Sequence, residues 1–134
     1  MTSTPRDERS EAGFTLVELL VVLAILGLLI AVATPQLIGY LGKAKVDTAR
    51  IQMHEMSTAL DMFLVDVGRY PSQQEGLGAL VANPGTLGAW RGPYLKASGV
   101  PLDPWGQPYQ YRIPGQNGHD YDLFTVNGNV VASQ

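Results

Sequence analysis

The stretch of sequence that decides the fold is GFTLVELLVVLAILGLLIAVA, from Gly13 to Ala33. After Phe14, its only polar side chains are those of Thr15 and Glu18. An apolar run of about 20 residues is long enough to cross the hydrocarbon core of a bilayer as a helix. Residues 14–34 are therefore predicted to form a membrane-spanning helix.

Residues 1–13, which precede this run, are polar, and five of them are charged: Arg6, Asp7, Glu8, Arg9 and Glu11. They have no apolar periodicity with which to pack a core, so we interpret them as a cleaved leader. An ordinary signal peptide is the alternative, because Ala31-Val32-Ala33 offers a small-residue cleavage site before Thr34. The charge of Glu18 inside the apolar run argues against that alternative.

The helical pattern continues beyond the apolar run. Seven apolar residues recur at alternating spacings of three and four: Val46, Ala49, Met53, Met56, Leu60, Phe63 and Val67. Such a stripe is typical of an amphipathic helix. A single helix is therefore predicted from Phe14 to about Val67, and Gly68 supplies its stop.

Pro35, Gly39 and Gly42 lie inside this predicted helix and weaken it. Proline lacks a backbone donor, and a glycine costs about 1 kcal/mol relative to alanine in a helix interior. A kink or local melting is expected at this helix break. We also expect residues 35–42 to become extended when subunits assemble.

The second half of the chain is rich in glycine and proline and has strand-like patterns. A short helix is predicted over 75–82, and strands over 108–113, 121–126 and 130–132. Asn127-Gly128 is a strong hairpin signal between the last two strands. Residues 35–134 are thus predicted to form one α+β domain, in which a small antiparallel sheet packs on the helix stripe. The facing of the second strand stays open, because Leu123 and Phe124 point to opposite sides.

Glu18 is the feature that carries a functional hypothesis. A carboxylate within a membrane span costs roughly 2.5–3.5 kcal/mol on insertion scales, and it is a functional-site candidate by default. If the chain is cut after Gly13, Phe14 gains a positive amine that Glu18 of a neighbouring subunit can neutralise. At 4 Å and an effective dielectric near 20, that attraction is about 4 kcal/mol before desolvation. The alternative without a function is that Glu18 is a charge tolerated near the membrane face.

The composition excludes several other classes of protein. The net charge of −3 does not suggest a nucleic-acid partner, and the lack of cysteine excludes disulfides and thiol catalysis. His54 and His119 are the only histidines, and they are not spaced as ligands of one metal ion. We interpret His54 as a helix-surface residue and His119-Asp120 as a loop pair. Neither a catalytic residue nor a metal ligand is predicted, and enzymatic activity is not expected.

Several motifs resemble those of a known family. The segment Gly13-Phe14-Thr15-Leu16-Val17-Glu18 resembles the processing motif of the type IV pilin superfamily. Further motifs resemble the major pseudopilin of bacterial type II secretion, the general secretion pathway protein G family. They include Ala59-Leu60-Asp61-Met62-Phe63, Arg69-Tyr70-Pro71, Asp103-Pro104-Trp105-Gly106 and Asp122-Leu123-Phe124.

The resemblance implies cleavage between Gly13 and Phe14 by a prepilin peptidase, with N-methylation of Phe14. It also implies a pilin-like fold, single-pass insertion in the inner membrane and a periplasmic C-terminal domain. The filament would be a homopolymer that helps drive folded proteins across the outer membrane. Its partners would be copies of itself, an inner-membrane assembly platform and minor pseudopilins.

The C-terminal loop departs from the pattern of the family, which usually carries an acidic, glycine-rich calcium site there. Here no carboxylate follows Asp122, although calcium prefers six to eight oxygen ligands that usually include carboxylates. We therefore expect no calcium site. Two other functions stay open: a subunit of a type IV pilus or DNA-uptake filament, and a membrane-tethered binding domain.

Overall fold

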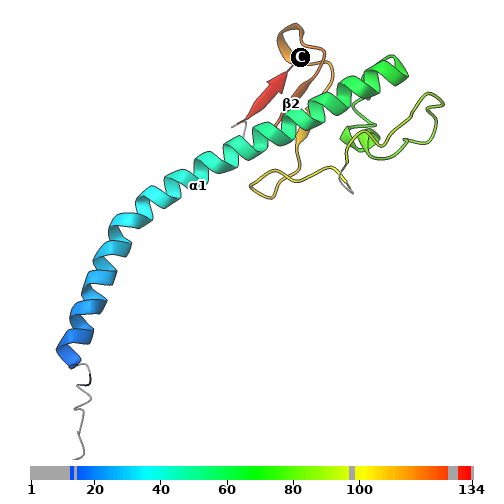
Figure 1. Cartoon of the computed structure of the whole chain (residues 1–134). Helices are drawn as coiled ribbons and strands as arrows, with labels where there is room; N and C mark the ends of the chain where they lie inside the picture. Colours follow the sequence, from blue (N-terminus) through cyan, green and yellow to red (C-terminus); the bar gives the residue numbers. More distant parts are fainter. Residues whose placement is uncertain (1–12, 14, 97–98, 127–129, 134) are drawn as a thin grey trace, which may run out of the picture. The chain divides into compact units, whose positions relative to one another are not determined.

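The computed structural model describes residues 13, 15–96, 99–126 and 130–133. Its elements follow one another in the order α1 (Leu16–Val67), η1 (Leu77–Leu80), β1 (Gln110–Arg112), η2 (Gln116–Gly118), β2 (Asp122–Phe124) and β3 (Val131–Ser133) (Figure 1). The fold is therefore the predicted α+β arrangement of one long helix and a small antiparallel sheet. The chain divides into two compact units between Gly39 and Tyr40. The second unit, which we call the head, holds the sheet.

Helix α1 contains 52 residues, and its bounds agree closely with the predicted ones. It ends at Gly68, whose φ of 84° is a left-handed conformation that glycine adopts without steric cost. The Gly68 N–H donates to the Leu64 carbonyl at 2.8 Å, so one of the last carbonyls of the helix is satisfied. The predicted stop at Gly68 is confirmed.

α1 runs through Pro35, Gly39 and Gly42 without interruption. A proline removes one backbone hydrogen bond, and a helix that continues on both sides keeps the others. The predicted local melting is thus not present in this structure. A break of residues 35–42 in an assembled filament stays a prediction, which a filament reconstruction tests directly.

The core of the head forms between the apolar stripe of α1 and the sheet. Five stripe residues are buried: Ala49, Met53, Met56, Leu60 and Phe63. Val46 and Val67 are partly buried against the same core. From the sheet and the residues next to it, Tyr109, Tyr111, Tyr121 and Leu123 join this core. The predicted stripe is confirmed.

The sheet has the order β1-β2-β3 with both pairings antiparallel. Its strands lie within or next to the predicted ranges, and the Asn127-Gly128 turn is outside the described residues. The open question of facing is settled, because Leu123 is fully buried whereas Phe124 is only partly buried. On the face of Phe124, the Arg112 guanidinium lies 4.9 Å from the ring centroid.

The helix predicted over 75–82 is wrong in extent. Only the single 3₁₀ turn η1 forms, and Gly76, directly before it, has a φ of 59°. A residue in this left-handed conformation cannot continue a helix, so the preceding turn at residues 73–76 is separated from η1.

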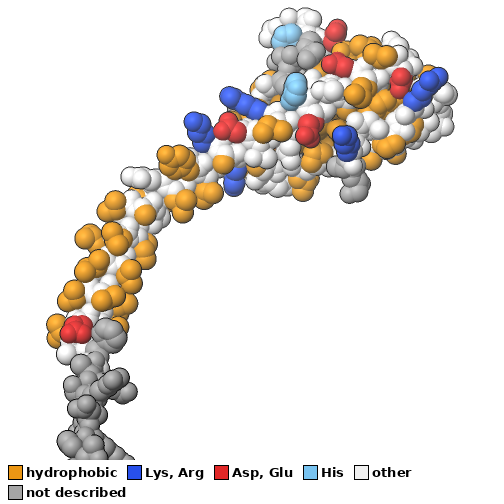
Figure 2. Space-filling model, viewed as in Figure 1, with side chains coloured by type: hydrophobic (Ala, Val, Ile, Leu, Met, Phe, Trp, Pro, Cys, Tyr) orange, Lys and Arg blue, Asp and Glu red, His pale blue; other side chains and the backbone are white. Residues whose placement is uncertain are grey.

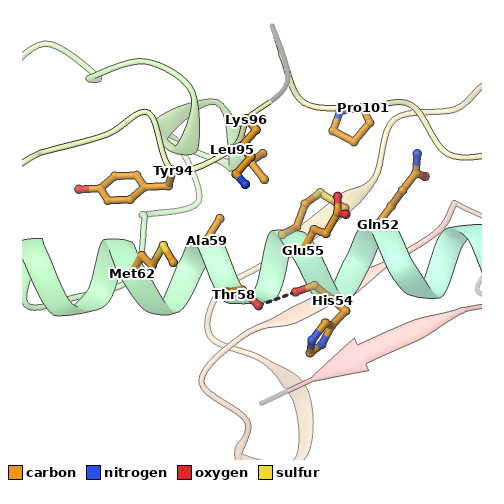
Figure 3. A pocket seen from close by; sticks show the side chains of 11 residues that line it. Gln52, His54, Glu55, Thr58, Ala59, Met62, Tyr94, Leu95, Lys96 and Pro101 are labelled. Carbon is orange, nitrogen blue, oxygen red and sulfur yellow. Dashed lines mark hydrogen bonds between the residues drawn. The ribbon is translucent and has the colours of Figure 1, made fainter.

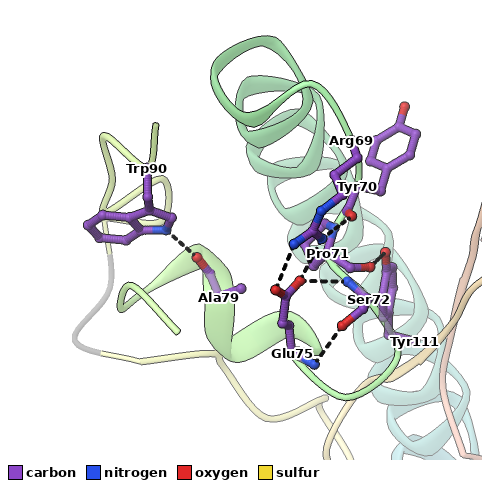
Figure 4. Close-up of polar contacts among 8 residues, drawn as sticks. All are labelled: Arg69, Tyr70, Pro71, Ser72, Glu75, Ala79, Trp90 and Tyr111. Atoms are coloured by element: carbon purple, nitrogen blue, oxygen red, sulfur yellow. Dashed lines mark hydrogen bonds and ion pairs between the residues drawn. The ribbon is translucent and has the colours of Figure 1, made fainter. Parts of the chain in front are cut away.

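An ion pair closes the connection between α1 and η1 (Figure 4). Arg69 donates to both oxygens of Glu75, at 2.8 Å each. The same carboxylate accepts the Ser72 N–H at 2.8 Å, and the Glu75 N–H donates to Ser72 Oγ at 3.2 Å. The hydrogen bond from Arg69 is the main reason why the pKa of Glu75 is lowered to about 2. We call residues 69–75 the clasp.

The clasp is joined to β1 by side-chain hydrogen bonds. Tyr111 donates its hydroxyl to the Pro71 carbonyl at 2.8 Å. Gln73 donates to the Tyr111 carbonyl at 2.8 Å and accepts the Ile113 N–H at 3.0 Å. The end of α1 is thereby fixed to the edge strand of the sheet.

Replacing Glu75 should destabilise the head in a pH-dependent way. Glu75→Gln removes charge-assisted hydrogen bonds, so we expect a loss of about 1.5–3 kcal/mol of unfolding free energy at pH 7. Because the folded-state pKa of Glu75 is depressed, its contribution is complete above the ordinary value of 4.5 and disappears as pH falls through about 2. Chemical unfolding of the full chain in detergent micelles should therefore show a smaller difference from wild type at pH 3 than at pH 7.

The matched control is Glu55→Gln, which removes an exposed carboxylate of α1. That change should alter the unfolding free energy by less than about 0.5 kcal/mol at either pH. A Glu75→Gln defect of equal size at pH 3 and pH 7 would contradict the role assigned to the ion pair.

Candidate functional site

The first part of α1 presents an apolar surface that no other part of the described chain covers. Every residue from Leu16 to Lys45 is exposed, including Leu16 at 76%, Leu28 at 67% and Ile38 at 65%. Hydrophobic side chains cover this part of the helix in Figure 2. The helix is long and apolar enough to cross a membrane. Exposed apolar surface of this extent indicates contact with lipid or with other protein chains.

Glu18 is the only charged residue between positions 15 and 42, and it lies in the first turn of α1. Thr15 caps this turn: its Oγ1 accepts the Glu18 N–H at 3.2 Å, and its carbonyl accepts the Leu19 N–H at 3.2 Å. A negative charge in a first turn is favoured by the helix dipole. Glu18 therefore has a local structural role beside any role in assembly.

The capping role of Thr15 was missed in the sequence, although its signal is present. A Thr followed three positions later by Glu is the capping-box pattern. Such a pattern in front of an apolar run marks the start of a helix. The structure thus brings Thr15 and Glu18 together at the end of the helix.

Gly13 lies just before this cap and is exposed, with open space where a side chain would be. Phe14 is outside the described residues, so the predicted cleavage site is described on one side only. Pro35, Gly39 and Gly42 are exposed on the same helix, away from Glu18 in the sequence.

The head has a hollow between α1 on one side and Tyr94–Lys96 and Pro101 on the other (Figure 3). Met56, Ala59 and Met62 contribute apolar side chains to it, and Glu55 and Lys96 contribute charged ones. His54 is exposed, whereas the buried Ser57 hydroxyl lies 2.6 Å from the Tyr121 hydroxyl.

Ser57 and His54 lie three positions apart on α1 but face different surroundings. Ser57 is hydrogen-bonded within the core rather than to the imidazole. The His54 backbone carbonyl accepts the Thr58 hydroxyl at 3.0 Å. The predicted surface position of His54 is confirmed.

Asp122 organises the other polar cluster of the head. It accepts the Gln116 N–H at 2.8 Å, which is the main cause of its lowered pKa, and lies 3.4 Å from His119 Nδ1. Arg112 lies 3.7 Å from it across the β1–β2 pair. His119 therefore contacts Asp122 rather than its sequence neighbour Asp120. The described residues contain no group of three or more His, Cys, Asp or Glu that could hold a metal ion.

Comparisons with known proteins match both parts of the chain. Residues 36–130 match the family model described as type II secretion system (T2SS), protein G. Residues 9–34 match the model of the prokaryotic N-terminal methylation motif. The second match contains Gly13, Thr15 and Glu18.

Relatives from several bacteria carry the name type II secretion system core protein G. The protein of Pseudomonas aeruginosa is 42% identical over 125 residues, which are 90% of this chain and 86% of the relative. The protein of Vibrio cholerae is 40% identical over 124 residues, 90% of this chain and 83% of the relative. These matches cover most of both proteins.

A solved structure is similar as well. The crystal structure of the major pseudopilin from the type 2 secretion system of enterohaemorrhagic Escherichia coli superposes with a TM-score of 0.58 at 32% identity. The match covers 75% of this chain and 94% of that one. On its fold, its N-terminal motif and these relatives, this chain belongs to the type II secretion system protein G family, the major pseudopilins.

Proposed function

We propose that this chain, a structural subunit of the type II secretion pseudopilus, polymerises through α1 to help drive folded proteins across the outer membrane. The observation that carries the proposal is the exposed apolar surface of Leu16–Leu41 with a single carboxylate in its first turn. Before assembly, lipid covers this surface; in the filament, the helices of neighbouring subunits replace the lipid. The subunit is inserted once in the inner membrane, with its head in the periplasm.

Processing is the first step of the proposed pathway. A prepilin peptidase cuts between Gly13 and Phe14, and the new Phe14 amine is methylated. The accessible position of Gly13 and the match of residues 9–34 to the methylation motif support this step. The further partners are an inner-membrane assembly platform and minor pseudopilins.

Assembly then uses the charge of Glu18. The carboxylate of one subunit neutralises the Phe14 amine of a neighbour, an attraction of about 4 kcal/mol at 4 Å and an effective dielectric near 20 before desolvation. In a subunit on its own, the Phe14 amine contacts only lipid and water and has no neighbouring Glu18 carboxylate. Pairing therefore favours the polymer.

The two alternatives from the sequence find less support. A type IV pilus or DNA-uptake pilin shares the N-terminal motif, but the head matches protein G over residues 36–130. A membrane-tethered binding domain would use α1 only as an anchor and would give Glu18 no purpose beyond helix capping. The proposed role is structural, without catalysis.

The mature chain should begin at Phe14. Cleavage after Gly13 removes the charged leader and creates the amine that the assembly mechanism needs. Intact-mass and N-terminal peptide analysis of membrane fractions should show loss of residues 1–13 and the gain of one methyl group. A mature chain that begins at Thr34 would establish the signal-peptide alternative instead.

Glu18→Gln should leave the protein in the membrane and reduce filament formation by at least about tenfold, since 1.4 kcal/mol of lost attraction is a factor of ten. Glutamine can still take the capping-box position after Thr15 but has no charge. This variant therefore separates pairing with Phe14 from helix capping. The measurements are the yield of sheared filaments and secretion of a folded substrate from cells that overproduce the subunit.

The control for this experiment is Thr15→Val, which removes the hydroxyl that caps α1 but keeps the carboxylate. It should lower filament yield less than Glu18→Gln does. Wild-type filament yield and secretion with Glu18→Gln would remove charge pairing from the mechanism.

Calcium should not stabilise the head. Asp122, the carboxylate nearest to the C-terminal loop in the sequence, already accepts the Gln116 N–H and lies beside Arg112 and His119. A guanidinium at this position repels a divalent cation, and the loop after Asp122 has no carboxylate. Residues 127–129 of that loop are outside the described residues.

Thermal unfolding of the full chain in micelles should give the same midpoint in millimolar calcium and in excess chelator. A site that contributes about 1 kcal/mol would raise the midpoint by about 4 °C or more for a domain of this size. If such a rise appears and is lost in Asp122→Asn, a calcium site survives in this chain.

A further inference from the structure

The periplasmic end of the apolar segment has a charge pattern that the proposed function leaves unexplained. After Glu18, the chain has no charged residue until Lys43, and Lys45 follows two positions later. Tyr40 is the only aromatic residue between positions 15 and 62, and it is 74% exposed. All three residues lie on the uninterrupted helix α1.

The spacing of these residues matches the thickness of a bilayer. Glu18 and Lys43 are 25 residues apart, which is about 38 Å of helix at 1.5 Å per residue. The hydrocarbon core is about 30 Å thick, and the whole bilayer with its headgroups about 40–45 Å. When Lys43 lies among the headgroups of one leaflet, Glu18 therefore lies at the boundary of the other.

This register changes the interpretation of Glu18. Near the centre of the membrane, a carboxylate lowers partitioning into the bilayer by roughly 70- to 370-fold, and this cost falls toward the interface. The chain is therefore able to insert with Glu18 ionised, close to the amine that cleavage creates.

Neither lysine has an ion-pair partner among the described residues. Both lysines are exposed. Their ammonium groups thus remain available to a ligand of negative charge. A tyrosine at the edge of an apolar span, followed by lysines within the next two turns, is the arrangement that anchors a helix at the headgroup level.

We propose that Tyr40, Lys43 and Lys45 form a docking surface for the anionic phosphate headgroups of phospholipids in the outer leaflet of the inner membrane. We call these three residues the lipid collar. The collar fixes the depth of α1 before assembly, and it releases its lipids when the subunit is withdrawn into a filament. This inference rests on the membrane insertion of α1 that is part of the proposed function.

The collar predicts selection of lipids by charge. Each lysine near an anionic surface changes association by about fivefold. The full chain, reconstituted in mixed vesicles of phosphatidylglycerol and phosphatidylcholine, should retain spin-labelled phosphatidylglycerol at least about fivefold more strongly than spin-labelled phosphatidylcholine. The preference should shrink in 0.5 M salt, where the Debye length is only a few ångströms.

The decisive comparison uses two double variants with the same change in charge. Lys43→Gln with Lys45→Gln should abolish most of the preference, whereas Arg91→Gln with Lys96→Gln, two exposed cations of the head, should keep it. Equal retention of both lipids by the wild type overturns the collar, and so does an equal loss in both double variants.

Measuring how deep α1 lies in the bilayer distinguishes an error in the lipid-collar proposal from an error in the proposed function. The chain has no cysteine, so a spin label can be attached at Ala24→Cys or Ala44→Cys alone. Position 24 should be accessible to oxygen in the hydrocarbon, and position 44 should lie at the headgroups. A label at 24 that is accessible to water contradicts insertion and with it the proposed function. A buried label at 24 with the label at 44 well outside the headgroups contradicts the collar alone.

Discussion

The head depends on one seam, the apolar stripe of α1 between Ala49 and Phe63. A three-stranded sheet with three residues in each strand is too small to bury a core by itself. The stripe supplies the second layer that such a sheet requires. Because α1 provides a rigid row of side chains at spacings of three and four, each segment of the head can pack on the same row.

Four tyrosine hydroxyls fix the position of the head along this seam. They are hydrogen-bonded to polar residues that follow or precede a stripe residue in the sequence: Gln52 with Tyr109, Ser57 with Tyr121, Asp61 with Tyr70, and Asp66 with Tyr94. Apolar packing alone would allow the rest of the head to shift along α1 by one helical turn. Each of these hydrogen bonds forms only at one position along the helix. Burial raises the pKa of all four tyrosines, so their hydroxyls remain protonated. The described side chains leave no buried polar atom without a partner.

The sequence was sufficient for the parts of the fold that local patterns determine. The stripe has helical periodicity, Gly68 ends the helix, and glycine- and proline-containing turns separate the strand-like runs, so these elements could be predicted within a few residues. The tyrosine partners could not, because Tyr121 and Ser57 are 64 positions apart in the chain and no local pattern pairs them. The extent of η1 was missed for a different reason: Gly76 takes a positive φ that its neighbours in sequence do not reveal. At the candidate site, the capping pattern of Thr15 and Glu18 is local and could be found in the sequence. The group that Glu18 contacts in an assembly belongs to another subunit, so the sequence and structure of a single chain do not show it.

The position of the seam also bears on how the helix can change during assembly. The first partly buried stripe residue is Val46, and the first of the four tyrosine-bonded residues is Gln52, so both follow Gly42. Residues 35–42 are exposed and contribute no side chain to the core. Loss of helix there would sacrifice a few backbone hydrogen bonds, one of which Pro35 has already removed, and glycines recover conformational entropy when they leave a helix. The head would keep its core, because the core residues that the structure describes begin at Val46. We therefore expect that loss of helix over residues 35–42 in a filament would leave the packed part of the head, from Val46 onward, intact.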